Sequence, residues 1–501
     1  MSKKRDLVIG IDCSTTACKA IVWDRHGNTI GEGRAPLSLL MPRAAWHEQD
    51  AESWWLATGQ AIRQAIAGVD VGRLAGLCIA HQRETFALVD EAGRPLRNAI
   101  VWMDERARSV LPSLDRLFGG ERIHRLTGKP LSGNLSLAKL AWLAENEPHM
   151  LRRTFKVVDV HAFLIRRLTG RFRTGWGCAD PMGLFDMPGK RWATDLLACI
   201  GLGPAHMPEV FPPGDVIGEV TDEAALQCGL PAGLPVVAGL GDGQAAGLGV
   251  NITQPGTAYL NLGTAVVSGA YSARYVVDRA FRTMYGGVPG SFSLETVILG
   301  GTYTVSWFVR QFGGHEEAWD AACGEVPPGS LGLLLVPYWN SAMNPYWDAA
   351  ASGIVVGWRG IHGKTHLYRA VLEGIAYEQR LHTSGVEAAL GETVHRYIVM
   401  GGGARSSRWC QIIADVTGKV VQQSAIGEAA ALGAGMLAAA GIHMYSSVPE
   451  AAAAMSHNEG QQFKPDDRHH DMYTRVYEDV YVHLFPSLQP YLRRLTEIAE
   501  S

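Results

Sequence analysis

The 501-residue sequence lacks the cysteine and histidine patterns that mark disulfide frameworks and zinc sites. Its eight cysteines are scattered without a CxxC pair, and its 17 histidines include no HExxH motif. Unpaired spacing of this kind is typical of reduced thiols in a cytosolic protein. A zinc site built from these residues has no support in the sequence.

The sequence also lacks a block of like charge. Its 45 Lys and Arg and 49 Asp and Glu are intermixed and give a net charge of −4. Binding to nucleic acid requires a basic patch that neutralises phosphates, so we expect no nucleic-acid partner. Anionic ligands would have to be held by local backbone amides and a few placed side chains.

No apolar run is long enough to cross a membrane. The longest run of small and apolar residues, 429–442, is rich in Ala and Gly and follows Glu428. A spanning helix needs about 20 apolar residues, so this run predicts a buried helix. The charged start leads directly into a short strand at Leu7, without the longer apolar region of a signal peptide. We therefore expect a cytoplasmic protein without membrane contact.

Two common nucleotide-binding fingerprints are incomplete. Gly363-Lys364-Thr365 matches the end of a P-loop, but Trp358 stands where the upstream glycine is required. The alternating glycines of 239–243 lack the third glycine of the dinucleotide motif, because Gln244 occupies that position. Neither motif therefore accounts for nucleotide binding in this chain.

The central stretch of the chain, Pro235–Gly249, combines an apolar run with a glycine-flanked carboxylate. The run predicts a buried strand, and Asp242 follows it between Gly241 and Gly243. Strand ends of this kind commonly present a functional side chain in α/β sheets. Asp is also a frequent helix N-cap, so catalysis and capping are both compatible with Asp242.

The first thirty residues predict a strand, a hydroxyl-rich turn and a returning strand. Leu7–Asp12 ends in a carboxylate, the turn contains Ser14, Thr15 and Thr16, and Lys19 follows. Hydroxyls, backbone N–H groups and a lysine can hold phosphate, and Asp12 can hold hydrated Mg²⁺. An ordinary hairpin turn is the alternative, because Ser and Thr are common in turns.

Two further strand ends present polar groups beside an aromatic residue. Leu74–Ala80 is followed by Arg83 and Glu84, and Ala99–Trp102 ends in an indole. A guanidinium, a carboxylate and a flat apolar face suit a polyhydroxylated ligand. A salt-bridged surface loop is the more usual fate of such charges.

The second half of the chain repeats the strand–turn–strand pattern. Strands are predicted at Thr257–Leu262 and Val266–Ala270 around Gly263-Thr264-Ala265, which indicates an internal duplication of architecture. A later strand, Tyr397–Met400, leads through the glycines of 401–403 into a helix. This arrangement suits a nucleotide, since a helix N-terminus favours phosphates.

Helices are predicted elsewhere from apolar spacing and strong helix formers. The main ones are Trp46–Ala67, Ser136–Asn146, Thr154–Thr169 and His366–Gly385, while Thr174–Asp186 is predicted as a glycine-rich loop.

Motifs along the whole chain together resemble the FGGY family of carbohydrate kinases. The matching segments are GIDCSTTACKAIVWD (10–24), WHEQDAESWW (46–55), HQRETF (81–86), AIVWMDERA (99–107), KLAWLAEN (139–146), GLGDGQAAGLG (239–249), NLGTAVVSG (261–269), NPYWD (344–348), GIVVGWRGIHGKTHLYRAVLEGIAYE (353–378) and MGGGARSSRW (400–409). Each segment is weak evidence by itself, but their common order is highly specific.

The resemblance implies an α/β protein of two actin-like (ribonuclease H-like) ATPase domains with the active site in the interdomain cleft. Residues 1–248 would form the N-terminal domain, with the sugar side and the first phosphate loop, and residues 249–501 the nucleotide side. Such kinases transfer the γ-phosphoryl group of ATP, with Mg²⁺, to a hydroxyl of a sugar or polyol. A homodimer is compatible with the family, although no sequence feature demonstrates an interface.

The resemblance also implies roles for individual residues. Asp242 matches the catalytic base and Asp12 the Mg²⁺-linked carboxylate. The phosphate and adenosine contacts correspond to Ser14, Thr15, Thr16 and Lys19 in the first loop, Gly263 and Thr264 in the second, and Gly401, Gly402 and Ser406 near adenosine. Two positions depart from the family pattern, since Ser14 replaces a glycine and Trp358 an aliphatic residue.

The predicted substrate wall combines features of two branches of the family. The residues matching glycerol contacts in the glycerol kinase branch are Arg83, Glu84, Trp102 and Asp242. Asn134 stands where that branch has a tyrosine, and Asp104 with Arg106 resembles the xylulose kinase branch. A short amide in place of an aromatic ring opens the pocket and adds donors and acceptors.

These features favour a pentulose or pentitol as substrate, with xylulose first. Glycerol, erythritol and xylitol are the alternatives. A different class of function, an actin-like ATPase or sugar sensor that transfers no phosphate, also stays open because a fold alone does not determine activity.

Overall fold

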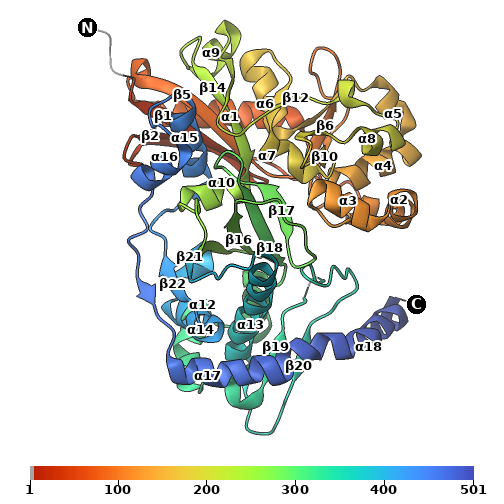
Figure 1. Cartoon of the computed structure of the whole chain (residues 1–501), viewed down its shortest axis with the longest axis vertical. Coiled ribbons are helices and arrows are strands. Elements are labelled where there is room, and N and C mark those ends of the chain that lie inside the picture. The colour runs from red at the N-terminus through yellow and green to blue at the C-terminus, as the bar shows by residue number, and fades with distance from the viewer. Residues whose placement is uncertain (1–4, 340, 501) are drawn as a thin grey trace.

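Buried apolar runs form the strands of two separate sheets, one in each lobe of the molecule. The computed structural model describes residues 5–339 and 341–500, and the two lobes are stacked along its long axis (Figure 1). The first lobe contains a six-stranded sheet of order β13-β14-β5-β1-β2-β3. The second contains a seven-stranded sheet of order β17-β18-β16-β15-β21-β22-β23.

In the first sheet, three neighbouring strands end at the same edge. The strands are β1 (Leu7–Cys13), β2 (Ala17–Asp24), β3 (Thr29–Pro36), β5 (Leu74–His81), β13 (Val216–Glu219) and β14 (Pro235–Gly241). β5 pairs in parallel with both β1 and β14, with Asp12 opposite Ala80 and Gly241 opposite His81. The residues that follow these strands are therefore brought together.

The second sheet repeats this arrangement. Its strands are β15 (Thr257–Leu262), β16 (Val266–Ser272), β17 (Arg282–Tyr285), β18 (Phe292–Ile298), β21 (Arg396–Met400), β22 (Val420–Gln423) and β23 (Gln462–Phe463). β15 forms an antiparallel hairpin with β16 and a parallel pair with β21, as β1 does with β2 and β5. The predicted duplication of architecture is thus visible in the strand pairing.

Helices cover both sheets. The first half of the chain contains α1 (Ala51–Ala65), α2 (Leu111–Phe118), α3 (Gly120–Thr127), α4 (Ser136–Asn146), α5 (Pro148–Arg153), α6 (Val160–Thr169), α7 (Trp176–Ala179), α8 (Thr194–Cys199), α9 (Asp222–Cys228) and α10 (Asp242–Gly249). The second half contains α11 (Thr302–Phe312), α12 (Glu316–Ala322), α13 (Lys364–Leu390), α14 (Ser407–Thr417), α15 (Ala429–Gly441), α16 (Val448–Met455), α17 (Asp467–Val476) and α18 (Val482–Glu500). Among the described residues, no helix has the length and hydropathy needed to cross a bilayer.

A small sheet, β4-β7-β6-β8, corrects two helix predictions. The helix predicted from Trp46 begins only at Ala51, because Glu48–Gln49 forms β4 and the Asp50 side chain caps α1. The helix predicted from Thr154 was wrong in its first part. Lys156–Asp159 is β8, paired with β6 (Phe86–Val89), and Asp159 then caps α6 by accepting from the Ala162 N–H. β7 (Ala99–Ile100) completes this sheet.

The predicted loop at Thr174–Asp186 was also wrong. β9 (Arg173–Gly175), α7 and β10 (Phe185–Asp186) lie in this segment. Gly175 would place a Cβ 2.5 Å from the Gly239 carbonyl, so the glycine allows β9 to approach β14 closely. Glycine here marks packing rather than a flexible loop.

The second half of the chain returns to the first lobe through α15 and α16. These helices lie beside β1 and β2 (Figure 1), and α15 packs on β1, β5 and α10. Small residues permit this contact: a Cβ on Gly10 would lie 1.8 Å from the Ala431 carbonyl oxygen. The boundary at residues 248 and 249 remains a prediction, and residues beyond it contribute to the first lobe.

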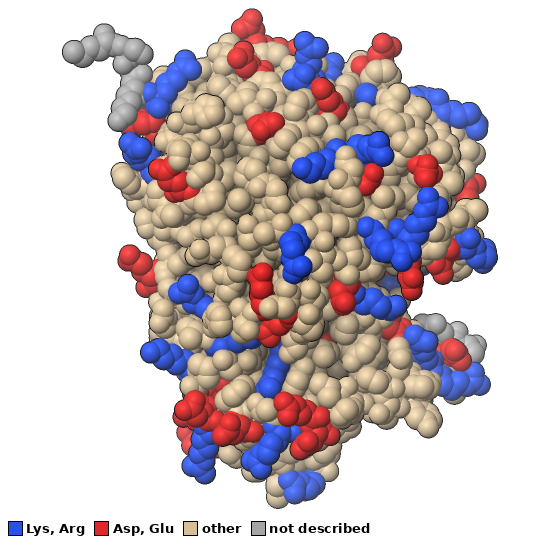
Figure 2. Space-filling model, in the orientation of Figure 1, with Lys and Arg blue, Asp and Glu red and all other residues tan. Residues whose placement is uncertain are grey.

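Both signs of charge occur on the surface of each lobe. On the face shown in Figure 2, Lys and Arg lie among Asp and Glu over both lobes. Buried ion pairs, by contrast, lie at the edge of the first sheet, where Arg83 contacts Glu295 and Arg282 contacts Glu84.

Replacing Gly433 of α15 by alanine should destabilise the fold. A Cβ at this position would lie 1.9 Å from the backbone oxygen of Ala245 in α10. Alanine is favoured over glycine in a helix by about 1 kcal/mol, but overpacking costs about 1–3 kcal/mol. We expect the urea midpoint of unfolding to fall for Gly433→Ala. It should not fall for Gly360→Ala, whose Cβ meets no atom within 4 Å. An unchanged Gly433→Ala midpoint would refute the tight contact.

Candidate active site

Asp12, Arg83 and Asp242 gather at the edge where β1, β5 and β14 end. Arg83 Nε lies 3.1 Å from Asp242 Oδ1. Gly241 makes room for this contact, because a Cβ there would lie 2.4 Å from Arg83 Cδ. The structure thus brings together three residues that the sequence predicts as functional.

Asp242 is held on one side and open on the other. Its Oδ1 accepts from the Gly243 N–H at 2.8 Å and contacts Arg83, while its side chain is 39% exposed. Among the described residues, no donor is bonded to Oδ2. Gly241 is the N-cap of α10, but Asp242 also binds an N–H of the first turn. Because no side chain caps α10, the capping role considered for Asp242 is wrong, and its catalytic role stays a prediction.

Asp12 has the environment of a cation ligand. It is 8% exposed, and its Oδ1 has no hydrogen-bond partner among the described residues. Burial above all, together with the negative charge of Asp242, raises the pKa of this carboxyl to about 7, against the effect of Lys19. A bound cation would offset both effects. The described residues contain no cluster of three or more metal-ligating side chains, but Mg²⁺ usually takes one or two carboxylates together with waters and phosphates.

The turn after β1 has its hydroxyl groups partly engaged. Ser14 donates to the Ala17 carbonyl at 2.8 Å, and Thr15 donates to Gln82 Oε1 at 3.2 Å. Thr16 is exposed. Lys19 Nζ lies 2.6 Å from Glu428 Oε2, just before α15. A phosphate at this turn would therefore compete with Glu428 for the lysine.

Trp102 links the turn to the predicted substrate wall. Its indole N–H donates to Thr15 Oγ1 at 3.0 Å, and the ring is half-buried. Lys139 of α4 donates to the carbonyls of both Trp102 and Asn134, which fixes their spacing. Burial lowers the pKa of Lys139 to about 7, while Glu84 acts in the opposite direction. Lys139 begins the KLAWLAEN segment that resembles the family, but the sequence did not predict that it holds these two carbonyls.

Asp104 lies in a closed ion-pair cluster and corrects a sequence prediction. Its Oδ1 accepts from Arg106 Nε at 2.8 Å, and its Oδ2 accepts from the His47 N–H at 2.6 Å. Arg106 also binds Glu48 at 2.8 Å. The Asp104 side chain has no exposed surface. A sugar therefore cannot contact this side chain directly, and Asp104 instead stabilises the segment after Trp102.

The second predicted phosphate loop forms the turn between β15 and β16. Thr264 is exposed, and Gly263 is half-buried. Their carbonyls accept from the N–H groups of Tyr303 and Thr302, at 3.1 and 2.9 Å, at the start of α11. The turn is therefore anchored on the second lobe while the Thr264 side chain remains accessible.

A cavity of about 730 Å³ opens after β21. Its walls are formed by residues 400–402, 404, 405, 407, 423–427 and 460. Gly401 has φ of 88°, a conformation that favours glycine. Ser406 does not line this cavity, because its hydroxyl caps α14 and donates to Asp320 at 2.9 Å. Gly401 and Gly402 thus border the cavity, whereas adenosine contact by Ser406 stays a prediction.

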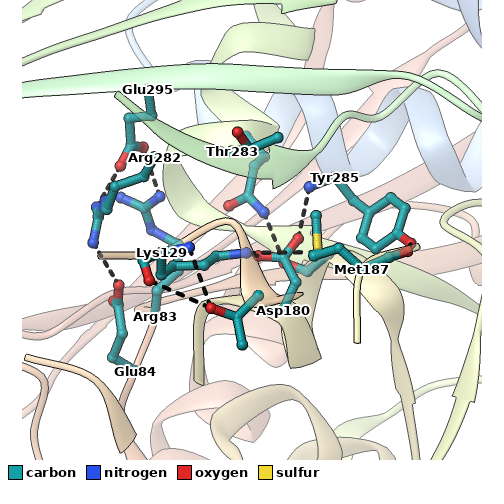
Figure 3. A network of polar contacts seen from close by, with 12 residues as sticks. Arg83, Glu84, Lys129, Asp180, Met187, Arg282, Thr283, Tyr285 and Glu295 are labelled. Atoms are coloured by element: carbon teal, nitrogen blue, oxygen red, sulfur yellow. Dashed lines mark hydrogen bonds and ion pairs between the residues drawn. The ribbon is translucent and has the colours of Figure 1, made fainter. Parts of the chain in front are cut away.

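Two charged residues of the second lobe complete the site and were not predicted from the sequence. Glu295 Oε2 accepts from Arg83 at 2.6 Å, and Arg282 donates to Glu84 Oε1 at 2.8 Å (Figure 3). Arg282 and Glu295 also pair with each other. A charged residue within an apolar strand pattern is the signal that could have found them, because an isolated charge is rarely buried without a partner.

Asp12→Asn should stabilise the metal-free protein, and more so at higher pH. Because the folded-state pKa is raised from 3.8 to about 7, ionisation of Asp12 opposes folding increasingly as pH rises between these values. The effect is absent below the unfolded-state pKa and reaches at most about 4 kcal/mol above the folded-state value. Thermal unfolding in chelator at about pH 5 and about pH 8 measures it. An equal or smaller gain at the higher pH would contradict the buried, unpartnered carboxylate.

Similarity to known proteins agrees with this geometry. The model of the FGGY carbohydrate kinase N-terminal domain matches residues 7–249, and that of the C-terminal domain matches residues 258–442. A xylulose kinase of Bacillus subtilis (strain 168) is 28% identical over 486 residues, which cover 95% of this chain and 97% of the relative. A glycerol kinase of Symbiobacterium thermophilum is 30% identical over 464 residues, covering 89% of this chain and 91% of the relative.

The fold comparison gives the same result. The crystal structure of xylulose kinase from Rhodospirillum rubrum superposes with a TM-score of 0.91 at 29% identity, covering 97% of this chain and 99% of that structure. The predicted two-domain, actin-like α/β fold is confirmed. Together with the site at the edge of the first sheet, these matches show that the chain belongs to the FGGY family and is a carbohydrate kinase.

Proposed function

We propose that this kinase phosphorylates a hydroxyl of a pentulose, most readily xylulose, with Asp242 as the general base. The half-exposed Asp242 carboxylate carries the proposal. Arg83 and Gly243 hold its Oδ1, and no donor among the described residues is bonded to its Oδ2. An acceptor hydroxyl can therefore approach the oxygen that is free to take its proton.

The proposed chemistry follows from this arrangement. The acceptor oxygen forms a bond to the γ-phosphorus of ATP, the bond from that phosphorus to the bridging oxygen breaks, and ADP leaves with the electron pair. The acceptor proton passes to Asp242. Because such transition states are loose, positioning and charge neutralisation supply most of the catalysis.

The remaining residues have positional roles in the proposal. Asp12 would hold Mg²⁺, which neutralises phosphate charge when bound. Its buried, unpartnered Oδ1 supports this assignment. The exposed Thr16 and Thr264 would meet the phosphates from the two turns, and Lys19 would leave Glu428 to do so. Adenosine would enter the cavity bordered by Gly401 and Gly402.

The choice of substrate rests on Asn134 and on the relatives. Asn134 is half-buried, and its carbonyl is fixed by Lys139. A side chain shorter than an aromatic ring leaves space for a longer acceptor than glycerol. The 28% identity to a named xylulose kinase supports the same choice, while the 30% identity to a named glycerol kinase keeps glycerol, erythritol and xylitol as alternatives.

Coupled measurement of ADP release should show dependence on an added acceptor, with xylulose preferred over ribulose, xylitol, erythritol and glycerol. Preference for glycerol would overturn the substrate assignment. ADP release that never depends on an acceptor would instead favour an ATPase without phosphoryl transfer. Light scattering of the same preparation tests the homodimer that the resemblance leaves open.

Asp242→Asn should keep the binding of acceptor and nucleotide but lose turnover by a factor of about 10²–10⁴, the usual contribution of a general base. Single-turnover rates and equilibrium binding measure the two effects separately. The matched control is Asp222→Asn, which changes an exposed carboxylate in the first turn of α9. Turnover like that of the wild type in Asp242→Asn would contradict the assigned base.

Asn134→Tyr should shift specificity toward shorter acceptors, because the ring would fill the space beside Trp102. We expect the ratio of kcat/KM for xylulose to that for glycerol to fall by about tenfold or more, as expected when about 1–3 kcal/mol of pocket complementarity is lost. Asn146→Tyr, at the end of α4, is the control. An unchanged ratio would remove Asn134 from the substrate wall.

A further inference from the structure

We propose that Arg282 and Glu295, both from the second lobe, are positioning residues that hold Arg83, Glu84 and, through Arg83, the base Asp242. This inference rests on the proposed function and deepens it. Neither residue would touch the substrate. Both would act through the side chains that do.

The observation is an unbroken chain of alternating charges. Asp242 contacts Arg83 at 3.1 Å, and Arg83 donates to Glu295 at 2.6 Å. Glu295 accepts through its other oxygen from Arg282, which donates in turn to Glu84 at 2.8 Å. Figure 3 shows Arg282 between the two glutamates. Each inner member thus binds two oppositely charged neighbours.

The inner members of this row of ion pairs are buried, so each depends on its neighbours to remain charged. Glu295 is 1% exposed, and Arg282 and Glu84 are also buried. Burial acts to raise the pKa of Glu295, but Arg83 and Arg282 outweigh it and hold the pKa below its usual value. Buried charges that lose a partner are strongly destabilised. Removal of one charge should therefore make its neighbours reorganise.

Two strands of the second sheet fix the geometry. Arg282 of β17 and Glu295 of β18 are directly opposite in the antiparallel register. β17 is the outermost strand of its sheet and is tied to the first lobe. The Thr283 N–H donates to the Gly128 carbonyl at 2.9 Å, and the Tyr285 N–H donates to Asp180 at 2.6 Å. Arg282 and Glu295 therefore lie on a strand pair that is hydrogen-bonded to the first lobe.

Glu295 limits how Arg83 can bind the base. Arg83 binds Glu295 through Nη1 and contacts Asp242 through Nε, so Glu295 fixes the orientation in which the guanidinium faces the base. Without the Glu295 charge, Arg83 would be free to turn, and the contact that holds Asp242 Oδ1 would change. Arg282 would also lose an anchor, and the hold on Glu84 would loosen. Proton transfer and acceptor binding should both suffer.

The test is steady-state kinetics of Glu295→Gln, a change that keeps side-chain shape and removes the charge. We expect kcat to fall and the acceptor KM to rise, with a combined loss of about 10²-fold in acceptor kcat/KM, the order expected for small misplacements at a reaction centre. The ATP KM should stay unchanged, because the nucleotide cavity has no lining residue in β17 or β18. Arg282→Lys keeps the charge with a single donor group and should show a smaller loss in the same parameters.

The matched control is Glu373→Gln. Glu373 is also buried, pairs with Arg369 at 2.7 Å and binds Tyr473, but it lies on α13 away from these charges. A purely structural loss lowers the active fraction, and hence kcat, while it leaves both KM values unchanged. Glu373→Gln should give that pattern, and Glu295→Gln should not.

The outcomes separate the inference from the function on which it rests. If the wild type is acceptor-dependent and Glu295→Gln leaves the acceptor KM unchanged, the positioning role is overturned while the proposed function stands. If the wild type never requires an acceptor, the proposed function fails, and the inference fails with it. Should Glu295→Gln not fold, judged by loss of ADP-induced thermal stabilisation, Arg282→Lys decides by the same acceptor KM.

Discussion

The proximity of two carboxylates, Asp12 and Asp242, is the constraint on which the rest of the site depends. Parallel pairing of β5 with β1 and β14 brings both to one sheet edge. Their mutual repulsion adds to the cost of burying Asp12. Arg83 offsets the charge of Asp242, and Lys19 acts on Asp12. Arg83 and Lys19 do not fully neutralise the two carboxylates. The remaining negative charge favours binding of a cation together with the phosphates that it accompanies.

The charges around these two carboxylates come from both halves of the chain, and this is a consequence of the crossover topology. Glu428, 409 residues after Lys19, reaches it because α15 returns to the first lobe. Glu295 and Arg282 reach Arg83 and Glu84 from the edge of the second sheet. The first-lobe residues proposed to bind sugar thus contact a strand pair that belongs to the sheet of the second lobe. Motion between the lobes would necessarily disturb these contacts, which couples the shape of the acceptor site to the position of the second lobe.

Local sequence signals predicted the parts of the site that follow strand ends. Asp12, Arg83 and Asp242 each stand after an apolar run, and strand ends gather functional side chains in α/β sheets. Arg282 and Glu295 could not be found this way, because 198 residues separate Arg282 from Glu84 and 212 separate Glu295 from Arg83. Such pairs depend on the relative placement of two sheets, which no local pattern contains. The error at Lys156–Asp159 has a related cause, since its pairing with β6 overrode the helical pattern of the flanking residues.

The departures of this chain from the family pattern fall where a side chain can be accommodated. Ser14 replaces a glycine in the first phosphate turn, yet its backbone does not adopt a positive φ. Its N–H and hydroxyl both bind the Ala17 carbonyl, so the side chain is folded back into the turn. Trp358 is 52% exposed and packs edge-on near His362. The Ser14 hydroxyl forms its hydrogen bond within the turn, and much of the Trp358 side chain faces solvent. Neither substitution therefore requires the strand ends that carry Asp12 and Asp242 to move.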